Sequence, residues 1–99
     1  MKEFLIRRAD DDFCLIHINR FDEVSRPESV KSVKIDGWGD YRLKIENCEV
    51  AFSFEMAGIQ ISFENCEITN ENAQNIVDEI CYKVETEIAS PCNSVQISE

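Results

Sequence analysis

The feature that most constrains the fold is an alternation of apolar and polar residues across positions 50–63. The apolar residues fall on even positions before Ala57-Gly58 and on odd positions after it: Val50, Phe52, Phe54, Met56, Ile59, Ile61 and Phe63. A two-residue turn at Ala57-Gly58 would place Met56 opposite Ile59 and Phe54 opposite Ile61, with every apolar side chain on one face. The sequence therefore predicts a β-hairpin whose apolar face is buried against the rest of the chain.

The tetrapeptide Glu-Asn-Cys-Glu occurs at both ends of this hairpin, around Cys48 and Cys66. Apolar residues change from odd positions in 41–45 to even positions from Cys48 onward, which predicts a turn or bulge at Glu46-Asn47. In the hairpin register above, Cys48 lies on the apolar face and Cys66 on the opposite face. The repeated tetrapeptide is therefore interpreted as the two ends of one hairpin and not as a pair of metal-binding or redox-active segments. All five cysteines are expected to be free thiols.

A single long helix is expected over residues 69–90. Its apolar residues recur at intervals of three, four and seven and form one stripe: Ala73, Ile76, Val77, Ile80, Cys81, Val84 and Ile88. Thr69 or Asn70 is suited to cap the start of the helix, and Ser90-Pro91 ends it. The stripe is predicted to pack on the apolar face of the hairpin.

The remaining segments are expected to complete an antiparallel sheet. Strands are predicted at 2–8, 13–21, 41–45 and 95–97, with a short strand at 30–36 and a loop at 22–29. The run 13–21 is nearly all apolar, so it is expected to be covered on both faces. This order predicts an α+β fold: a meander-like antiparallel sheet of about five to six strands, one long amphipathic helix on one face, and a short last strand.

The chain of 99 residues is long enough for one domain with a single core. Its 20 acidic and 10 basic residues give a net charge of −10, and the whole imbalance lies in residues 45–99, where Lys83 is the only basic residue. Carboxylates repel phosphates, so binding to nucleic acid or to an anionic membrane is not expected. The charge indicates either a basic protein partner or solubility alone.

The sequence contains no recognisable catalytic motif. The sole histidine, His17, lies three residues after Cys14 in a predicted strand, so the two side chains would point to opposite faces. The cysteines show no CxxC spacing and no histidine placed to complete a zinc site, so neither a metal nor another cofactor is expected. An odd number of cysteines in a chain without a secretory signal predicts a cytoplasmic location.

Exposed side chains on the outer face of the helix are the best candidates for partner binding. Tyr82 is expected to point away from the core, among the carboxylates of Asp78, Glu79 and Glu85. An aromatic residue ringed by carboxylates is a suitable anchor for a basic partner. Trp38, between two glycines, is expected either to be presented to a partner or to fold back onto the edge of the sheet.

Three functional hypotheses follow. The favoured one is a non-catalytic module that binds a basic protein, in the manner of a toxin-neutralising immunity protein or another stoichiometric inhibitor. The second is a small-molecule-binding or enzymatic domain that uses His17 or a cysteine in a pocket between helix and sheet. The third is a structural subunit of a homo-oligomer, such as a homodimer formed through a sheet edge or the outer sheet face.

Overall fold

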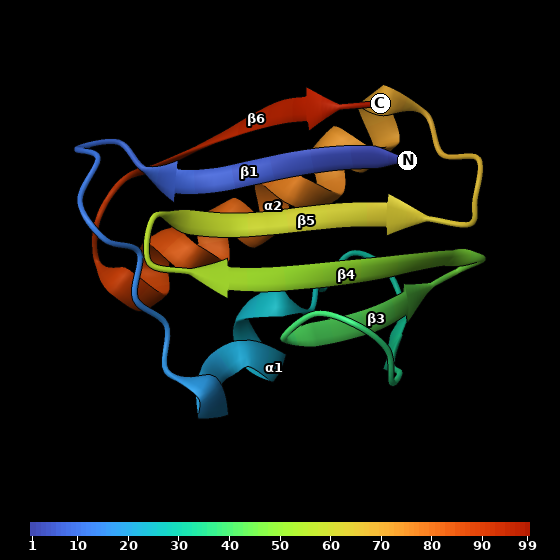
Figure 1. Cartoon of the computed structure of the whole chain (residues 1–99), viewed down its shortest axis with the longest axis horizontal. Helices are drawn as coiled ribbons and strands as arrows, with labels where there is room; N and C mark the ends of the chain where they lie inside the picture. Colours follow the sequence, from blue (N-terminus) through green and yellow to red (C-terminus); the bar gives the residue numbers. More distant parts are fainter.

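The computed structural model describes all 99 residues as an α+β fold of two layers. The strands are β1 (Lys2–Arg8), β2 (Ser32–Lys34), β3 (Tyr41–Ile45), β4 (Cys48–Glu55), β5 (Gly58–Glu64) and β6 (Cys92–Ser98). The helices are α1 (Phe21–Ser25) and α2 (Asn70–Ile88), and a short 3₁₀ turn, η1 (Ile18–Arg20), precedes α1. The six strands form one antiparallel sheet in the order β2-β3-β4-β5-β1-β6 (Figure 1). The predicted fold class is confirmed.

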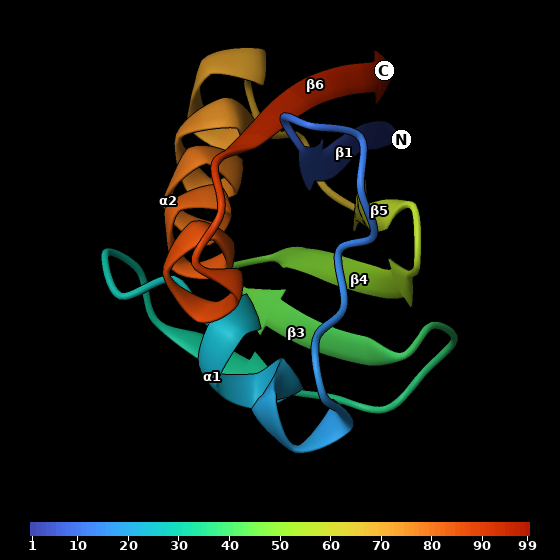
Figure 2. The same ribbon diagram turned by 90° about the vertical axis from the view of Figure 1, so that its left-hand side faces the viewer.

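The long helix α2 covers one face of the sheet (Figure 2). Its buried residues are those of the predicted stripe, apart from a half-buried Ile88: Ala73, Ile76, Val77, Ile80, Cys81 and Val84. The Thr69 hydroxyl accepts a hydrogen bond from the Asn72 amide, which caps the start of the helix as predicted. The helix ends at Ala89, whose backbone is left-handed with φ 54°. No helix in the structure has the length and apolar character needed to cross a membrane.

The β4–β5 hairpin has the predicted apolar face but a different register. Phe54 lies opposite Ile59 instead of Ile61, and the two turn residues are Met56 and Ala57. The predicted pairing is therefore wrong by two residues. Because side chains alternate between faces with a period of two, this even shift leaves every side chain on its predicted face.

Gly58 is the physical reason for this difference. A Cβ on Gly58 would lie only 2.6 Å from the Ile6 carbonyl oxygen of β1. In the sequence, Gly58 indicates a turn. In the structure it is the buried first residue of β5, and its missing side chain allows β1 to approach β5 closely.

Cys48 and Cys66 form a disulfide with their Cα atoms 4.9 Å apart, so the prediction that they lie on opposite faces is wrong. The hairpin register continues the alternation as far as Glu64. The next residue, Asn65, adopts a left-handed conformation with φ 57°, which breaks the alternation and turns Cys66 towards Cys48. The prediction of five free thiols is corrected to three free thiols: Cys14, Cys81 and Cys92.

The strand predicted at 13–21 is also wrong. Residues 12–17 form an extended segment without strand pairing, which leads into η1 and α1. A hydrogen bond from the Cys14 amide to the Met56 carbonyl links the segment to the β4–β5 turn. Of the apolar residues of the predicted strand, Phe13, Leu15 and Ile18 are exposed, whereas Cys14 is buried. The chain passes here from the sheet to the helical layer (Figure 2), so the apolar run is covered only in part.

The segments on either side of β3 follow the sequence prediction more closely. Part of the loop predicted at 22–29 is helical, because α1 extends to Ser25. The short strand predicted within 30–36 is β2. Ile45 pairs directly with Cys48, so Glu46 and Asn47 form a two-residue turn, as predicted. The residue with positive φ in this turn is Glu46, at 55°, and not the asparagine.

We expect Phe52→Ala to lower the free energy of unfolding by about 3–5 kcal/mol, because a fully buried ring is replaced by a cavity. Phe54 shares this face but is only half-buried, so Phe52 is the sharper probe. The matched control is Phe13→Ala, at an exposed position, which should change stability by less than about 0.5 kcal/mol. Chemical denaturation measures both, and equal losses would contradict the burial of Phe52.

Reduction of the Cys48–Cys66 disulfide should destabilise the protein by about 3 kcal/mol, because the bridge closes a loop between residues 18 positions apart. Denaturation with and without a reductant measures this difference. A Cys48→Ala/Cys66→Ala variant should unfold equally under both conditions. Thiol titration of the unreduced, denatured protein should find three thiols, and five would contradict the bridge.

Candidate protein-binding site

Tyr82 lies on the exposed side of α2 and is 69% exposed. It borders a hollow of about 330 Å³ between α1 and α2, called the α1–α2 hollow below. The residues that line it belong to both helices and the adjoining turns: Arg20, Glu23, Val24, Glu28, Glu79, Tyr82, Lys83, Thr86 and Glu87. Figure 2 shows α1 beside the C-terminal half of α2, so the two helices form opposite walls of the hollow.

The wall formed by α1 is firmly anchored although the helix is short. The Phe21 ring stacks on Phe54 of β4 with 3.9 Å between ring centroids, and Val24 is fully buried. The Tyr41 hydroxyl donates a hydrogen bond to the Asp22 carboxylate. Burial and this hydrogen bond raise the pKa of Tyr41 to about 12. These contacts fix the orientation of α1 relative to the sheet.

Glu79, which the sequence predicts as a partner contact, forms hydrogen bonds within the chain at the rim of the hollow. Its carboxylate accepts hydrogen bonds from the Glu28 amide and from the amide and hydroxyl of Ser29. Burial raises the pKa of Glu79, but these hydrogen bonds outweigh burial and bring the pKa below its usual 4.5. Glu79 therefore joins α2 to the loop that follows α1.

Both cations of the hollow already have partners. Arg20 forms an ion pair with Glu87 across the two helical elements, with 3.0 Å between Nη2 and Oε1. Lys83 Nζ donates a hydrogen bond of 2.6 Å to the Arg26 carbonyl oxygen. The charge of Arg20 also acts on Glu23, and that of Lys83 on Glu79, without a direct ion pair in either case.

Two carboxylates at the hollow have no side-chain partner in the structure. Glu23 of α1 and Glu28 of the following loop are exposed, and neither side chain forms a hydrogen bond or an ion pair. The lining as a whole has four carboxylates against two cations. An excess of negative charge beside an exposed aromatic ring favours a cation.

Glu23 and Glu28 are not among the site residues predicted from the sequence, because residues 22–29 are predicted to form a loop. The available signal is weak: Asp22 and Arg26 stand four residues apart, a spacing that stabilises a helical turn, and they do form an ion pair of 2.8 Å. Nothing in the sequence indicates that this turn packs beside Tyr82.

The other two predicted carboxylates, Asp78 and Glu85, lie on the β6 side of α2 and not in the hollow. Asp78 Oδ1 accepts hydrogen bonds of 3.0 Å from Ser94 Oγ and 2.8 Å from Gln74 Nε2. Glu85 Oε2 accepts one of 2.8 Å from the Cys92 amide. These two residues therefore hold β6 against α2.

Trp38 lies on the sheet face opposite the helices. Its ring covers the guanidinium of Arg42, with 5.5 Å from Cζ to the ring centroid, and the residue remains half-exposed. Arg42 is buried on this face and forms ion pairs with Glu49 and Glu64. The structure therefore does not bring Trp38 together with Tyr82.

The groups considered for catalysis are poorly placed for it. His17 is exposed, and its Nδ1 lies 2.8 Å from Asn19 Oδ1 at the start of η1. The three free cysteines are buried. Burial raises the pKa of Cys14, that of Cys81 to about 11 and that of Cys92 to about 12, so all three are protonated thiols at neutral pH. A protonated thiol is a weak nucleophile.

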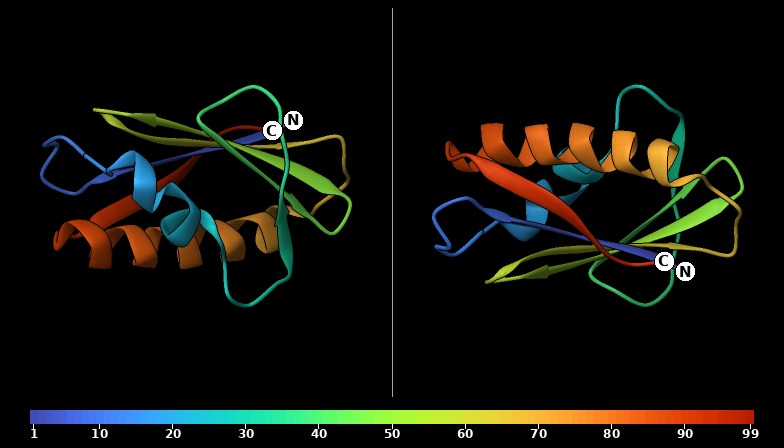
Figure 3. Two further views of the ribbon diagram at one scale, coloured as in Figure 1. Left: turned by 90° about the horizontal axis from the view of Figure 1, so that it is seen from below. Right: turned by 90° about the horizontal axis from the view of Figure 1, so that it is seen from above.

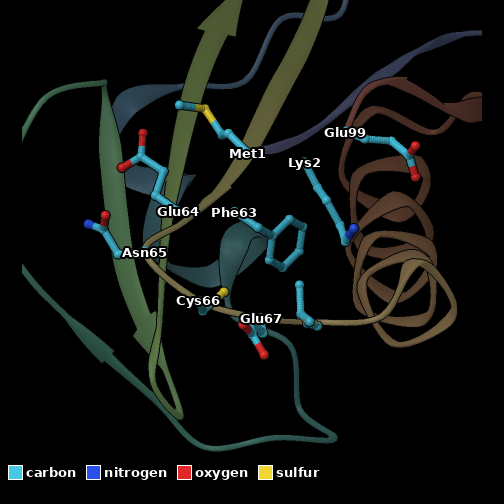
Figure 4. A pocket seen from close by; sticks show the side chains of 9 residues that line it. Met1, Lys2, Phe63, Glu64, Asn65, Cys66, Glu67 and Glu99 are labelled. Carbon is cyan, nitrogen blue, oxygen red and sulfur yellow. The ribbon is translucent and has the colours of Figure 1, made fainter.

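A larger hollow, of about 620 Å³, lies where the ends of the sheet meet the connection to α2 (Figure 4). Its charged side chains are Lys2, Glu64, Glu67 and Glu99, of which Glu64 is paired with Arg42. In Figure 4, Glu64 and Glu99 lie on opposite sides of the Phe63 ring. Because its polar groups do not converge on one point, this hollow is a weaker candidate site than the smaller one between the helices.

Comparison of the chain with protein-family models, with curated proteins and with solved structures finds no match.

Glu79→Gln should lower the free energy of unfolding at neutral pH by about 1–2 kcal/mol, because hydrogen bonds to a charged acceptor are weakened. The pKa of Glu79 is lowered in the folded state, so its contribution is present above pH 4.5 and is lost as the pH falls through the folded-state pKa. The difference between wild type and variant should therefore shrink as the pH falls from 6 to 3.

Denaturation midpoints across this pH range provide the measurement. The control is Glu23→Gln, which removes a charge from the same hollow but no hydrogen bond, and should change stability little. A Glu79→Gln deficit that is constant with pH would show that the carboxylate charge has no part in holding the loop.

Proposed function

We propose that the protein is a non-catalytic protein-binding module, and that the α1–α2 hollow receives a cationic side chain from a basic partner. The observation that carries this proposal is the exposed ring of Tyr82 in the same hollow as the unpaired carboxylates of Glu23 and Glu28. No other hollow described above combines an exposed aromatic ring with free charges of one sign.

An arginine is the side chain that fits this arrangement best. Its planar guanidinium stacks on an aromatic ring, and its N–H groups form paired hydrogen bonds with a carboxylate. Tyr82 supplies the ring, and Glu23 or Glu28 supplies the carboxylate. Because α1 is anchored by Phe21 and Val24, both walls of the hollow are already in position before a partner binds.

The net charge of −10 supports a basic partner. A negative field accelerates the encounter with a positively charged protein, and the effect weakens as salt is added. Such a module would act by occlusion: it would cover a basic surface or active site in a one-to-one complex, as a toxin-neutralising immunity protein or another stoichiometric inhibitor does.

The proposal includes a cytoplasmic location for the protein. Three buried free thiols support it, because thiols persist in reducing compartments, whereas the Cys48–Cys66 bridge is more typical of an oxidising compartment. Alkylation of thiols in intact source cells, followed by mass spectrometry, decides between them. Alkylated Cys48 and Cys66 would fit the cytoplasm, and a bridge intact at the moment of alkylation would contradict it.

Tyr82→Ala should raise the dissociation rate of the basic protein that co-purifies from source cells by about 30-fold, equivalent to 2 kcal/mol, with little change in association rate. Glu28→Lys should instead lower the association rate and flatten its salt dependence. Both side chains are exposed, so both variants should fold normally. Surface plasmon resonance at several ionic strengths measures the two rates.

The matched control is Glu55→Lys, which makes the same change in net charge at an exposed site on β4 whose side chain has no bonded partner. It should slow association less than Glu28→Lys does. If Glu28→Lys and Glu55→Lys have the same effect and Tyr82→Ala has none, binding uses the general charge of the protein and not the hollow.

A further inference from the structure

The two edges of the sheet differ in length and charge. β2, at one edge, has only three residues. Its last residue is Lys34, and Lys31 immediately precedes its first residue. Short strands with lysines are a common protection against pairing with another strand. β6, at the other edge, has seven residues, Cys92–Ser98, and none of them is charged. In the view from above, β6 runs along its edge with no segment drawn across it (Figure 3, right).

The backbone of β6 has free hydrogen-bonding groups along this edge. The Ala9 amide donates to the Pro91 carbonyl, and the same register continues through the pairing of Leu5 with Val95. Because backbone groups alternate in direction along a strand, Asn93 and Val95 bond to β1, while Ser94 and Gln96 direct their N–H and C=O groups outward. No backbone hydrogen bond to these outward groups exists within the chain.

The side chains of β6 divide between the two faces. Ser94 and Gln96 face α2, where they bond to Asp78 and Asn70. Val95 and Ile97 face the opposite way and are 47% and 50% exposed. The edge therefore combines free backbone groups with an apolar outer side.

We propose that β6 pairs antiparallel with β6 of a second copy of this chain, about a two-fold axis at Val95. In this register Val95 lies opposite the partner subunit's Val95. Ser94 exchanges backbone hydrogen bonds with the partner subunit's Gln96, and the sheet continues from one copy into the other. This inference does not depend on the α1–α2 hollow, which lies across α2 from β6.

A second copy suits this edge better than a basic partner does. The strand carries no charge with which to attract a cation, and the outward groups of Ser94 and Gln96 match themselves under a two-fold rotation. Each copy contributes a net charge of −10, so repulsion opposes pairing at low ionic strength. We therefore expect a weak dimer that strengthens as salt is added, opposite to the salt dependence of a complex with a basic protein.

Sedimentation equilibrium on the full chain at rising protein and salt concentration tests the pairing. The wild type should show a monomer–dimer equilibrium that shifts towards dimer with salt. Val95→Lys places two cations opposite each other and should raise the dissociation constant by about tenfold or more. The matched control, Val33→Lys on the opposite edge strand, replaces a valine that is also exposed and should dimerise like the wild type.

The register is tested by crosslinking. In the proposed pair, Val95 and its symmetry mate are a non-hydrogen-bonded pair with Cα atoms about 4.5 Å apart, a distance that a disulfide spans. Val95→Cys should therefore form a covalent dimer with copper phenanthroline as the oxidant, whereas Asn93→Cys and Val33→Cys should not. The native free cysteines are buried and should not interfere.

A wild type that is monomeric at millimolar concentration and high salt would overturn the proposal, as would equal effects of Val95→Lys and Val33→Lys. Crosslinking through Asn93→Cys in preference to Val95→Cys would overturn the register. These results are separable from those for the hollow: Tyr82→Ala should dimerise normally, and Val95→Lys should still bind a basic partner.

Discussion

The apolar face of the six-stranded sheet is wider than the one long helix that packs on it. Much of the remaining structure follows from this difference in width. A helix of 19 residues is about 28 Å long, and six strands span about 24 Å, but a helix is only about 10 Å wide. α2 lies against β1 and β6, which leaves the β3 side of the sheet to be covered by α1. Figure 3 shows the two helices side by side on this face, and the hollow beside Tyr82 is the space that remains between them.

Most of the acidic side chains on α2 serve the fold. Glu79 bonds to the loop after α1, Asp78 and Glu85 bond to β6, and Glu87 pairs with Arg20. The net charge of −10 is therefore a poor guide to which carboxylates are free to bind a partner. The hydrogen bonds of each carboxylate show whether it joins two elements of the fold or is only exposed to solvent. Glu23 and Glu28 are exposed and have no side-chain hydrogen bond.

The sequence predicts the fold well where periodicity is strong and poorly where a single residue breaks it. The stripe of α2 and the apolar face of β4–β5 both extend over several repeats, so one misplaced turn does not change which side chains are buried. The left-handed backbone conformation of Asn65 concerns one residue, yet it brings Cys66 next to Cys48. Two cysteines that are predicted to be free thiols therefore form a disulfide. The segment 13–21 has the composition of a buried strand, but it takes no position in the sheet, and three of its apolar residues, Phe13, Leu15 and Ile18, are exposed.

The candidate site is less predictable than the fold because it joins elements that are distant in sequence. Tyr82 is identifiable from the helix stripe alone, since it lies off the buried positions. Its neighbours in the hollow come from α1 and from the loop that follows α1, where the only helical signal is the weak one of the Asp22–Arg26 spacing. The position of α1 depends on the stacking of Phe21 on Phe54. Tertiary packing, and not local pattern, creates the hollow.

The proposed function depends on the binding of a cationic side chain in the α1–α2 hollow. A titration of the isotope-labelled protein with N-acetyl-arginine amide, followed by ¹H–¹⁵N NMR spectra, tests it most directly. Binding in the hollow should give saturable shifts concentrated at Glu23, Glu28 and Tyr82, and these shifts should be lost in a Glu23→Gln/Glu28→Gln variant. Shifts distributed over all exposed carboxylates, or unchanged in that variant, would contradict it.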